Sequence, residues 1–137
     1  MNGVANGLYG GDLPNQINTP WIDFSEQSTI VGWSSFTAKQ IRYKIFNKIL
    51  FLSFNIDGTS NNATTNFSLP FALDIMPMQG IIYAINNSVP RISRYSITVT
   101  SGANIISFDL YSSLNNVENF SNSGRKVVRG QIFYEIN

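Results

Sequence analysis

Short apolar runs separated by clusters of Asn, Ser, Gly and Thr limit the fold of this chain more than any other feature. From Trp21 onward the runs are rich in Ile, Val, Phe and Tyr, and turn-forming clusters interrupt them about every eight to twelve residues. The apolar residues are mainly β-branched or aromatic, and no window holds an apolar stripe at the helical period. The pattern predicts an all-β fold, an antiparallel β-sandwich of jelly-roll type, with no helix longer than a single turn.

The first 20 residues differ from the rest of the chain. They contain four Gly and two Pro and little periodicity, which indicates an arm or connector over residues 1–20 and a single sandwich domain over 21–137. This segment lacks the basic flank and apolar run of a secretory signal, and no stretch approaches the ~20 apolar residues of a membrane span. We therefore expect a soluble protein made in a cytosol, without membrane insertion.

Residues 41–58, IRYKIFNKILFLSFNIDG, carry the clearest strand pattern. Asn47 and Lys48 separate two strand-like runs, and Asn tolerates the positive φ of a tight hairpin turn, although Lys stands where Gly is preferred and a longer loop stays open. In the second run one face is apolar throughout, whereas the other is apolar only at Ile49 and Phe51. Loops or a second subunit must cover that apolar start. The predicted core positions are Leu50, Leu52, Phe54 and Ile56.

Two later segments show the same alternation. Tyr95, Ile97 and Val99 alternate with polar residues, and Ser101–Asn104 leads into a second apolar face, which predicts a second hairpin. The chain closes with KVVRGQIFYEIN, which we expect to dock as a strand because an undocked strand would expose its backbone and its side chains. Gly130 marks a bulge or a close backbone approach there. The predicted inward residues of the two segments are Ile106, Phe108, Leu110, Val128, Ile132, Tyr134 and Ile136.

Composition excludes several classes of chemistry. The chain has no His and no Cys, so the commonest metal ligands and every mechanism based on imidazole or thiolate are missing, and we expect no cofactor and no metal. A net charge of +1 without a basic stripe argues against nucleic acid. The acidic residues are scattered except for Asp23 and Glu26, whereas a glycosidase needs two carboxylates about 5–10 Å apart in a cleft. We expect no enzymatic activity.

The order of the segments carries a resemblance over roughly residues 30–137. It resembles the C-terminal β-domain that recurs in phage tail-fibre and related virion proteins, from which the sequence departs by having Asn47-Lys48 where Gly-Asn or Gly-Lys is expected. The matching segments are GWSSFTAKQIRYK, YKIFNKILFLSFNIDGTSN, FSLPF, YAINNS, SITVTSG, ISFDL and SGRKVVRGQIFYEI.

The resemblance implies a β-sandwich that packs as a homotrimer on a virion and recognises a host-cell glycan or protein. The first 20 residues would then attach the domain to other virion subunits. An alternative is a purely architectural virion protein, such as a capsid decoration, a head fibre or a tail assembly module. A lectin-like protein outside any virus is a more distant third interpretation.

Candidate ligand-binding residues are aromatic or rich in amides and hydroxyls. Trp33 could stack on a sugar, but large aromatic side chains more often fill cores. The predicted loop 57–62 offers groups suited to sugar hydroxyls or Ca²⁺, and a solvated turn is the alternative. Ser123–Lys126 is interpreted as a short solvated turn. The candidates from the polar segments are Asp57, Asn61, Asn62, Asn86 and Asn87.

The low charge and the two-faced strands also predict an oligomer, because a monomer rarely exposes so much apolar surface. Only 12% of the residues are charged. Closed symmetry would hide the exposed surface, and a trimer suits a fibre axis. The predicted interface residues are Trp21, Phe36, Ile49 and Phe51.

Overall fold

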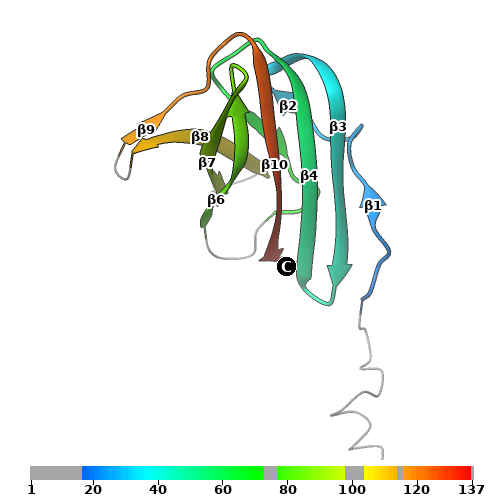
Figure 1. The fold of residues 1–137 in the computed structure, drawn as a ribbon. Helices are drawn as coiled ribbons and strands as arrows, with labels where there is room; N and C mark the ends of the chain where they lie inside the picture. Colours follow the sequence, from blue (N-terminus) through cyan, green and yellow to red (C-terminus); the bar gives the residue numbers. More distant parts are fainter. Residues whose placement is uncertain (1–16, 73–76, 98–103, 114–115, 137) are drawn as a thin grey trace, which may run out of the picture.

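The computed structural model describes residues 17–72, 77–97, 104–113 and 116–136, and its regular structure is entirely β (Figure 1). No helix occurs in these ranges. The strands are β1 (Ile22–Asp23), β2 (Ile30–Val31), β3 (Trp33–Phe46), β4 (Ile49–Ser60), β5 (Asn66–Ser68), β6 (Met78–Asn86), β7 (Val89–Ile97), β8 (Ile105–Ser113), β9 (Asn116–Glu118) and β10 (Arg125–Glu135).

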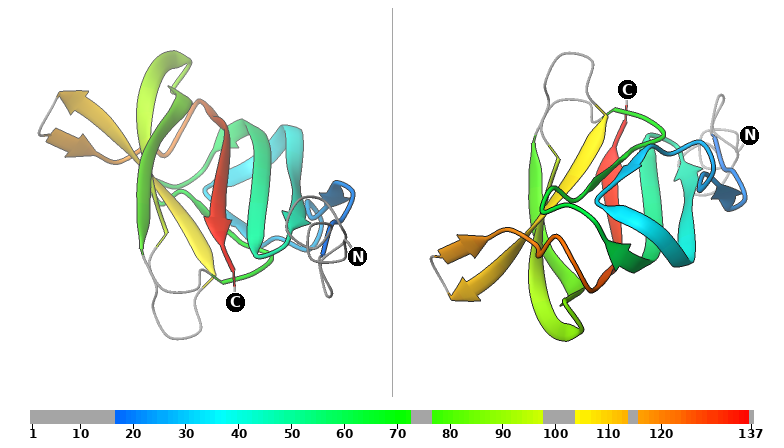
Figure 2. Two further views of the ribbon diagram at one scale, coloured as in Figure 1. Left: turned by 90° about the horizontal axis from the view of Figure 1, so that it is seen from below. Right: turned by 90° about the horizontal axis from the view of Figure 1, so that it is seen from above.

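All the strands belong to one antiparallel sheet. Its order is β1-β3-β4-β10-β6-β7-β8-β5-β2, and β9 pairs with β8 outside this path. The sheet curls on itself, so that β3, β4 and β10 lie on one side of the molecule and β6, β7 and β8 on the other (Figure 2). The predicted all-β, antiparallel, sandwich-like fold is confirmed. The predicted docking of the last segment is also confirmed, since β10 lies between β4 and β6.

The β3–β4 hairpin forms around the predicted turn. Phe46 pairs with Ile49, so Asn47 and Lys48 form a two-residue connection, and Asn47 has a φ of 56°. Lys48 is not among the residues with positive φ, so Asn47 alone adopts the left-handed backbone that tight hairpin turns require. A lysine therefore fits the second position, where no positive φ is required.

The β6–β7 hairpin turns at Asn87 and Ser88, whose φ angles are 49° and 68°. Positive φ at both central residues defines a type I′ turn, which matches the twist of the flanking strands. The polar segment Asn86-Asn87-Ser88 is thus a tight hairpin turn. In the β7–β8 hairpin, Tyr95 and Ile97 pair with β8 as predicted, whereas Val99 and Ser101–Ala103 lie outside the described residues.

The core fills the inside of the curled sheet. Phe54 of β4 contacts Phe67 of β5 and Phe108 of β8, with ring centroids 5.3 and 5.7 Å apart. These rings join the two sides of the sheet, and burying one such side chain contributes about 1.5–3 kcal/mol. The predicted core positions that the structure describes are all buried, namely Leu50, Leu52, Phe54, Ile56, Tyr95, Ile97, Ile106, Phe108, Leu110, Val128, Ile132, Tyr134 and Ile136.

Gly130 forms no bulge, because Arg129, Gly130 and Gln131 pair with β4 in continuous register. The side chain of Ile82 occupies the space that a Cβ at Gly130 would need, 2.8 Å from its ideal position. The close approach at this glycine therefore comes from a side chain.

The predicted arm is described only from residue 17 onward. Asn18 forms an isolated bridge with Phe46, and the N–H of Thr19 donates to the carbonyl oxygen of Ile45 at 2.9 Å. These residues continue along the free edge of β3. Residues 1–16 lie outside the described structure, so the attachment role of the arm stays a prediction.

Gly32 links β2, at one end of the sheet order, to β3, which is next to the strand at the other end. β2 pairs with β5, and after one residue β3 begins and pairs with β4. Gly32 has a φ of 116°, a conformation that side chains rarely adopt. A Cβ there would lie 2.5 Å from the carbonyl oxygen of Thr64. This glycine therefore lets the sheet curl until its two ends meet.

Replacing Gly32 with Ala should lower the free energy of unfolding by about 3 kcal/mol, because the methyl group meets backbone and the φ angle is unfavourable. The control is Gly130→Ala, which meets the movable side chain of Ile82 and should cost about half as much. Equilibrium unfolding in urea measures both. Equal losses in the two variants would contradict the role assigned to Gly32.

Candidate functional site

The structure gathers most of the predicted polar residues at one end of the molecule. Asn86 accepts a hydrogen bond at Oδ1 from the N–H of Ser121, 2.8 Å away. Ser60, at the end of β4, donates from Oγ to the carbonyl oxygen of Ser121 at 2.6 Å. The segment before β10 therefore joins the Asn61-Asn62 and Asn86-Asn87 regions, which are distant in sequence.

Asp57 was predicted to lie in a loop, and that prediction is wrong. It belongs to β4, which continues to Ser60 and pairs with both β3 and β10. Its carboxylate accepts two hydrogen bonds from Arg125, from Nε at 3.0 Å and from Nη2 at 2.7 Å. This bidentate bond, the largest cause, lowers the pKa of Asp57. Both carboxylate oxygens of Asp57 are therefore already engaged.

Trp33 is also placed inside the fold. Its side chain is buried, with 6% exposed, and its indole N–H donates to the carbonyl oxygen of Lys126 at 3.0 Å. A ligand role for Trp33 stays an untested prediction, but little of the ring faces solvent. Of the other candidates, Asn61, Asn62 and Asn87 are exposed, and Oδ1 of Asn62 accepts from the N–H of Thr64.

Lys126 was expected in a solvated turn, and that prediction is wrong. It belongs to β10 and is fully buried. Its ammonium group donates to the carbonyl oxygens of Gly32 and Asn62 at 3.0 and 2.7 Å and to Oγ1 of Thr65 at 2.8 Å. The group also lies 5.0 Å from the ring centroid of Trp33. Three acceptors match its three N–H donors, so the buried charge is fully hydrogen-bonded.

Three of the four predicted interface residues lie on the outside of β1 and β4, where Trp21 stacks on Arg42 of β3, 4.7 Å from its ring centroid. Ile49 and Phe51 alternate with inward residues on β4, and Trp21 directly precedes β1, which pairs with β3. Phe133 of β10, 62% exposed, pairs with Phe51 in register with ring centroids 6.1 Å apart. We call Trp21, Ile49, Phe51 and Phe133, which β3 divides into Trp21 on one side and the other three on the other, the outer aromatic face. Phe36 lies apart, opposite Gly58 near the polar end.

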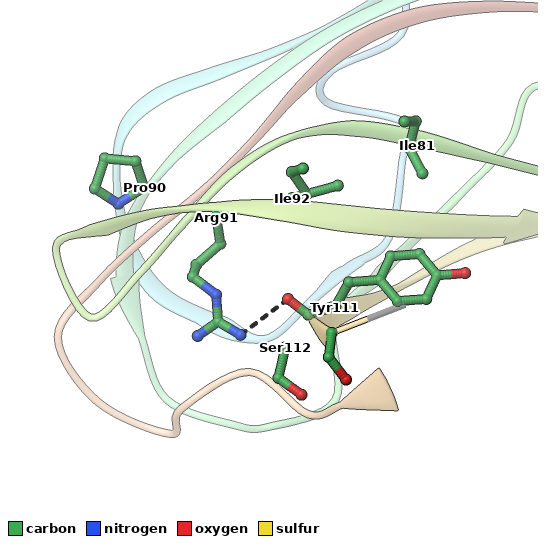
Figure 3. Close-up of a pocket in the computed structure, with 7 residues that line it drawn as sticks. Ile81, Pro90, Arg91, Ile92, Tyr111 and Ser112 are labelled. Carbon is green, nitrogen blue, oxygen red and sulfur yellow. Dashed lines mark hydrogen bonds between the residues drawn. The ribbon is translucent and has the colours of Figure 1, made fainter. Parts of the chain in front are cut away.

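A cavity that the sequence analysis did not foresee opens beside β7. Strands β7 and β8 pair from Ile97 and Ile106 as far as Ser93 and Leu110, after which β8 continues into the β9 hairpin that projects from the body (Figure 1). The cavity has a volume of about 780 Å³, and Figure 3 shows its lining. The lining residues are Ile81, Pro90, Arg91, Ile92, Tyr111, Ser112 and Ser113.

Only the alternation of exposed isoleucines could have pointed to this cavity. Ile81 and Ile92 occupy positions that a strand pattern assigns to one face, and they are 66% and 56% exposed. The separation of β7 from β8 depends on where β9 turns back, which no local residue pattern indicates.

The carboxylates of Asp23 and Glu26 are each bound by a polar side chain. The carboxylate of Asp23 accepts from both the N–H and Oγ of Ser25 at 2.9 and 2.6 Å, and the side-chain bond is the largest cause that lowers the pKa of Asp23. Glu26 forms an ion pair with Lys39 at 2.9 Å. No group of three potential metal ligands occurs in the described ranges.

Comparisons with known proteins include a weak structural similarity. No family model matches the chain, and no curated protein matches it. Among solved structures, the chain is similar to a reovirus attachment protein, sigma1, solved in complex with alpha-2,3-sialyllactose, with a TM-score of 0.44 and 12% identity over 80% of this chain and 67% of that chain. This level of similarity assigns neither a family nor a ligand. The described part of the chain has no helix long and apolar enough to cross a membrane.

The buried ammonium group makes stability depend on pH. Desolvation by burial lowers the pKa of Lys126 from 10.5 to about 8, so between these values the unfolded chain binds more protons and stability rises with pH. We expect the free energy of unfolding of the wild type, relative to Lys126→Met, to rise by up to about 3 kcal/mol across this range.

Urea unfolding of both proteins at pH 7.5, 8.5, 9.5 and 10 would measure this difference. Burial raises the pKa of Tyr95 and Tyr134, which lowers stability at high pH equally in both proteins and cancels in the comparison. Parallel stability curves for the two proteins would contradict the prediction.

Proposed function

We propose that the chain is a virion protein that attaches a phage to its host cell, as a fibre tip or receptor-binding domain. The observation that carries a binding role is exposed apolar surface at two places on the outer side of the sheet, where Phe133 contacts Phe51 and where Ile81 lies beside Ile92. Contiguous exposed apolar side chains mark interaction surfaces. The order of strand segments, which resembles that of phage tail-fibre C-terminal domains, supplies the virion assignment.

The proposal divides the surface between two tasks. The outer aromatic face forms the contact between three copies of the chain, and the residues before Trp21 connect the trimer to other virion subunits. The remaining exposed surface, including the amides of Asn61, Asn62 and Asn87 and the cavity beside β7, faces the host. Three copies would convert weak binding at each site into strong attachment.

The trimer is tested by Phe51→Asp and Phe133→Asp. Each substitution places a charge in the proposed contact, so the molar mass from light scattering after gel filtration should fall from three times 15.3 kDa to 15.3 kDa. The matched control is Val117→Asp, since Val117 and Phe51 are both 39% exposed and Val117 lies on β9, away from the face. A monomeric wild type would contradict the trimer.

Attachment is tested with fluorescently labelled wild-type protein and a panel of intact bacterial strains. We expect saturable binding to at least one strain, measured by flow cytometry and displaced by unlabelled protein. Heat-denatured protein is the control for nonspecific adsorption. Absence of saturable binding, together with tight co-purification with other virion subunits, would instead support the architectural alternative.

A further inference from the structure

The gap between β7 and β8 has the dimensions of a small-molecule site. β7 keeps its pairing with β6 over its full length, from Met78 and Ile97 to Asn86 and Val89, but it leaves β8 beyond Ser93. The cavity at this point measures about 780 Å³, whereas ligand pockets commonly measure about 300–1,000 Å³. We call this gap the β7–β8 cleft.

The walls of the cleft are closed to an added peptide strand. Pro90 lies on the part of β7 that has left β8, and proline has no N–H to donate to a new strand. On the opposite wall, the carbonyl oxygen of Tyr111 accepts from Nη2 of Arg91 at 3.1 Å. Neither wall therefore offers a complete set of backbone hydrogen-bond donors and acceptors to an added strand. This favours a ligand that is not an extended peptide.

The polar groups of the cleft suit a neutral ligand with several oxygens. Nη2 of Arg91 also forms an ion pair with Oε2 of Glu118 at 3.1 Å, so the guanidinium charge is largely balanced. Within the described residues, the N–H groups on Nε and Nη1 of Arg91 make no hydrogen bond. Ser112 and Ser113 add hydroxyl groups that can both donate and accept.

The apolar groups of the cleft suit a methyl group beside a C–H face. Ile81 and Ile92 come from neighbouring strands and are 66% and 56% exposed. Both line the cavity together with Tyr111, whose side chain is drawn in Figure 3. An aromatic ring packs well against the C–H face of a saturated ring, and a buried methyl group adds about 0.8 kcal/mol of binding free energy.

We propose that the β7–β8 cleft binds one neutral pyranose unit that carries a methyl group, either an N-acetylated or a 6-deoxy sugar. Its methyl group packs between Ile81 and Ile92, its C–H face packs on Tyr111, and its oxygens accept from Arg91. This inference rests on the proposed function, because the sugar would be a unit of the host receptor.

Saturation-transfer NMR with the full chain tests this ligand class. The probes are N-acetylglucosamine, rhamnose and fucose, with glucose and galactose as sugars without a methyl group. We expect transfer to at least one methyl-bearing sugar, strongest at its methyl protons, and weaker transfer to the other two. No transfer to any of the three methyl-bearing sugars, or equal transfer to all five, would overturn the proposal.

Two variants of cleft residues test whether the sugar binds in the cleft. Ile92→Asp and Tyr111→Leu should each weaken binding about tenfold. Val89→Asp is the matched control, because Val89 and Ile92 are both 56% exposed on β7 and Val89 does not line the cavity. Circular dichroism and thermal melting verify that each variant folds. Unchanged sugar binding in both folded cleft variants would overturn the site.

The same variants in the cell-binding assay separate this inference from the proposed function. If Ile92→Asp and Tyr111→Leu bind cells as strongly as the wild type does, the cleft is not the receptor site, and the proposal that the protein attaches to cells still holds. Sugar binding by a protein that binds no cell leaves the cleft standing and overturns attachment. If the two variants lose cell binding and the wild type shows no saturation transfer to any sugar, the cleft binds a protein on the cell and the sugar assignment is overturned.

Discussion

The buried side chain of Lys126 is the contact that ties together the most distant segments of the sheet. It reaches from the central strand β10 to Gly32 between β2 and β3, to Asn62 after β4, and to Thr65 before β5. These segments are the points where a curled sheet must bring its two ends together. A charge costs several kcal/mol to bury and needs donors and acceptors in fixed positions. The hydrogen bonds of Lys126 therefore hold the seam in one geometry.

The curl that Lys126 holds in place also determines which apolar side chains stay outside. One face of β4 and β10 fills the core, whereas Phe51 and Phe133 pair on the other face, and nothing in the described chain covers them fully. The same curvature turns β8 away from β7 and opens the β7–β8 cleft. The surfaces proposed for assembly and for ligand binding thus both lie on the outside of the curled sheet.

The candidate site was only partly predictable, for reasons that differ from residue to residue. Asn87 was selected for its amide, which is exposed, but the structure uses its left-handed conformation in a type I′ turn. Asp57 was placed in a loop because Gly58, Thr59 and Ser60 follow it, yet long-range pairing with β3 and β10 keeps this polar stretch extended. Polar residues form strands when neighbouring strands supply the hydrogen bonds, and local composition does not contain that information.

The sequence by itself determined the strand class, the inward faces of β4, β7, β8 and β10 and the β3–β4 turn, because alternation of apolar residues and the conformational tolerance of Asn47 act over a few residues. Only the tertiary structure decided that Lys126 is buried, that Asp57 and Arg125 pair across strands, and that Ile81, Ile92 and Tyr111 line one cleft. Each of these depends on contacts between segments tens of residues apart, whose positions follow from the order of strands in the sheet and from no local pattern.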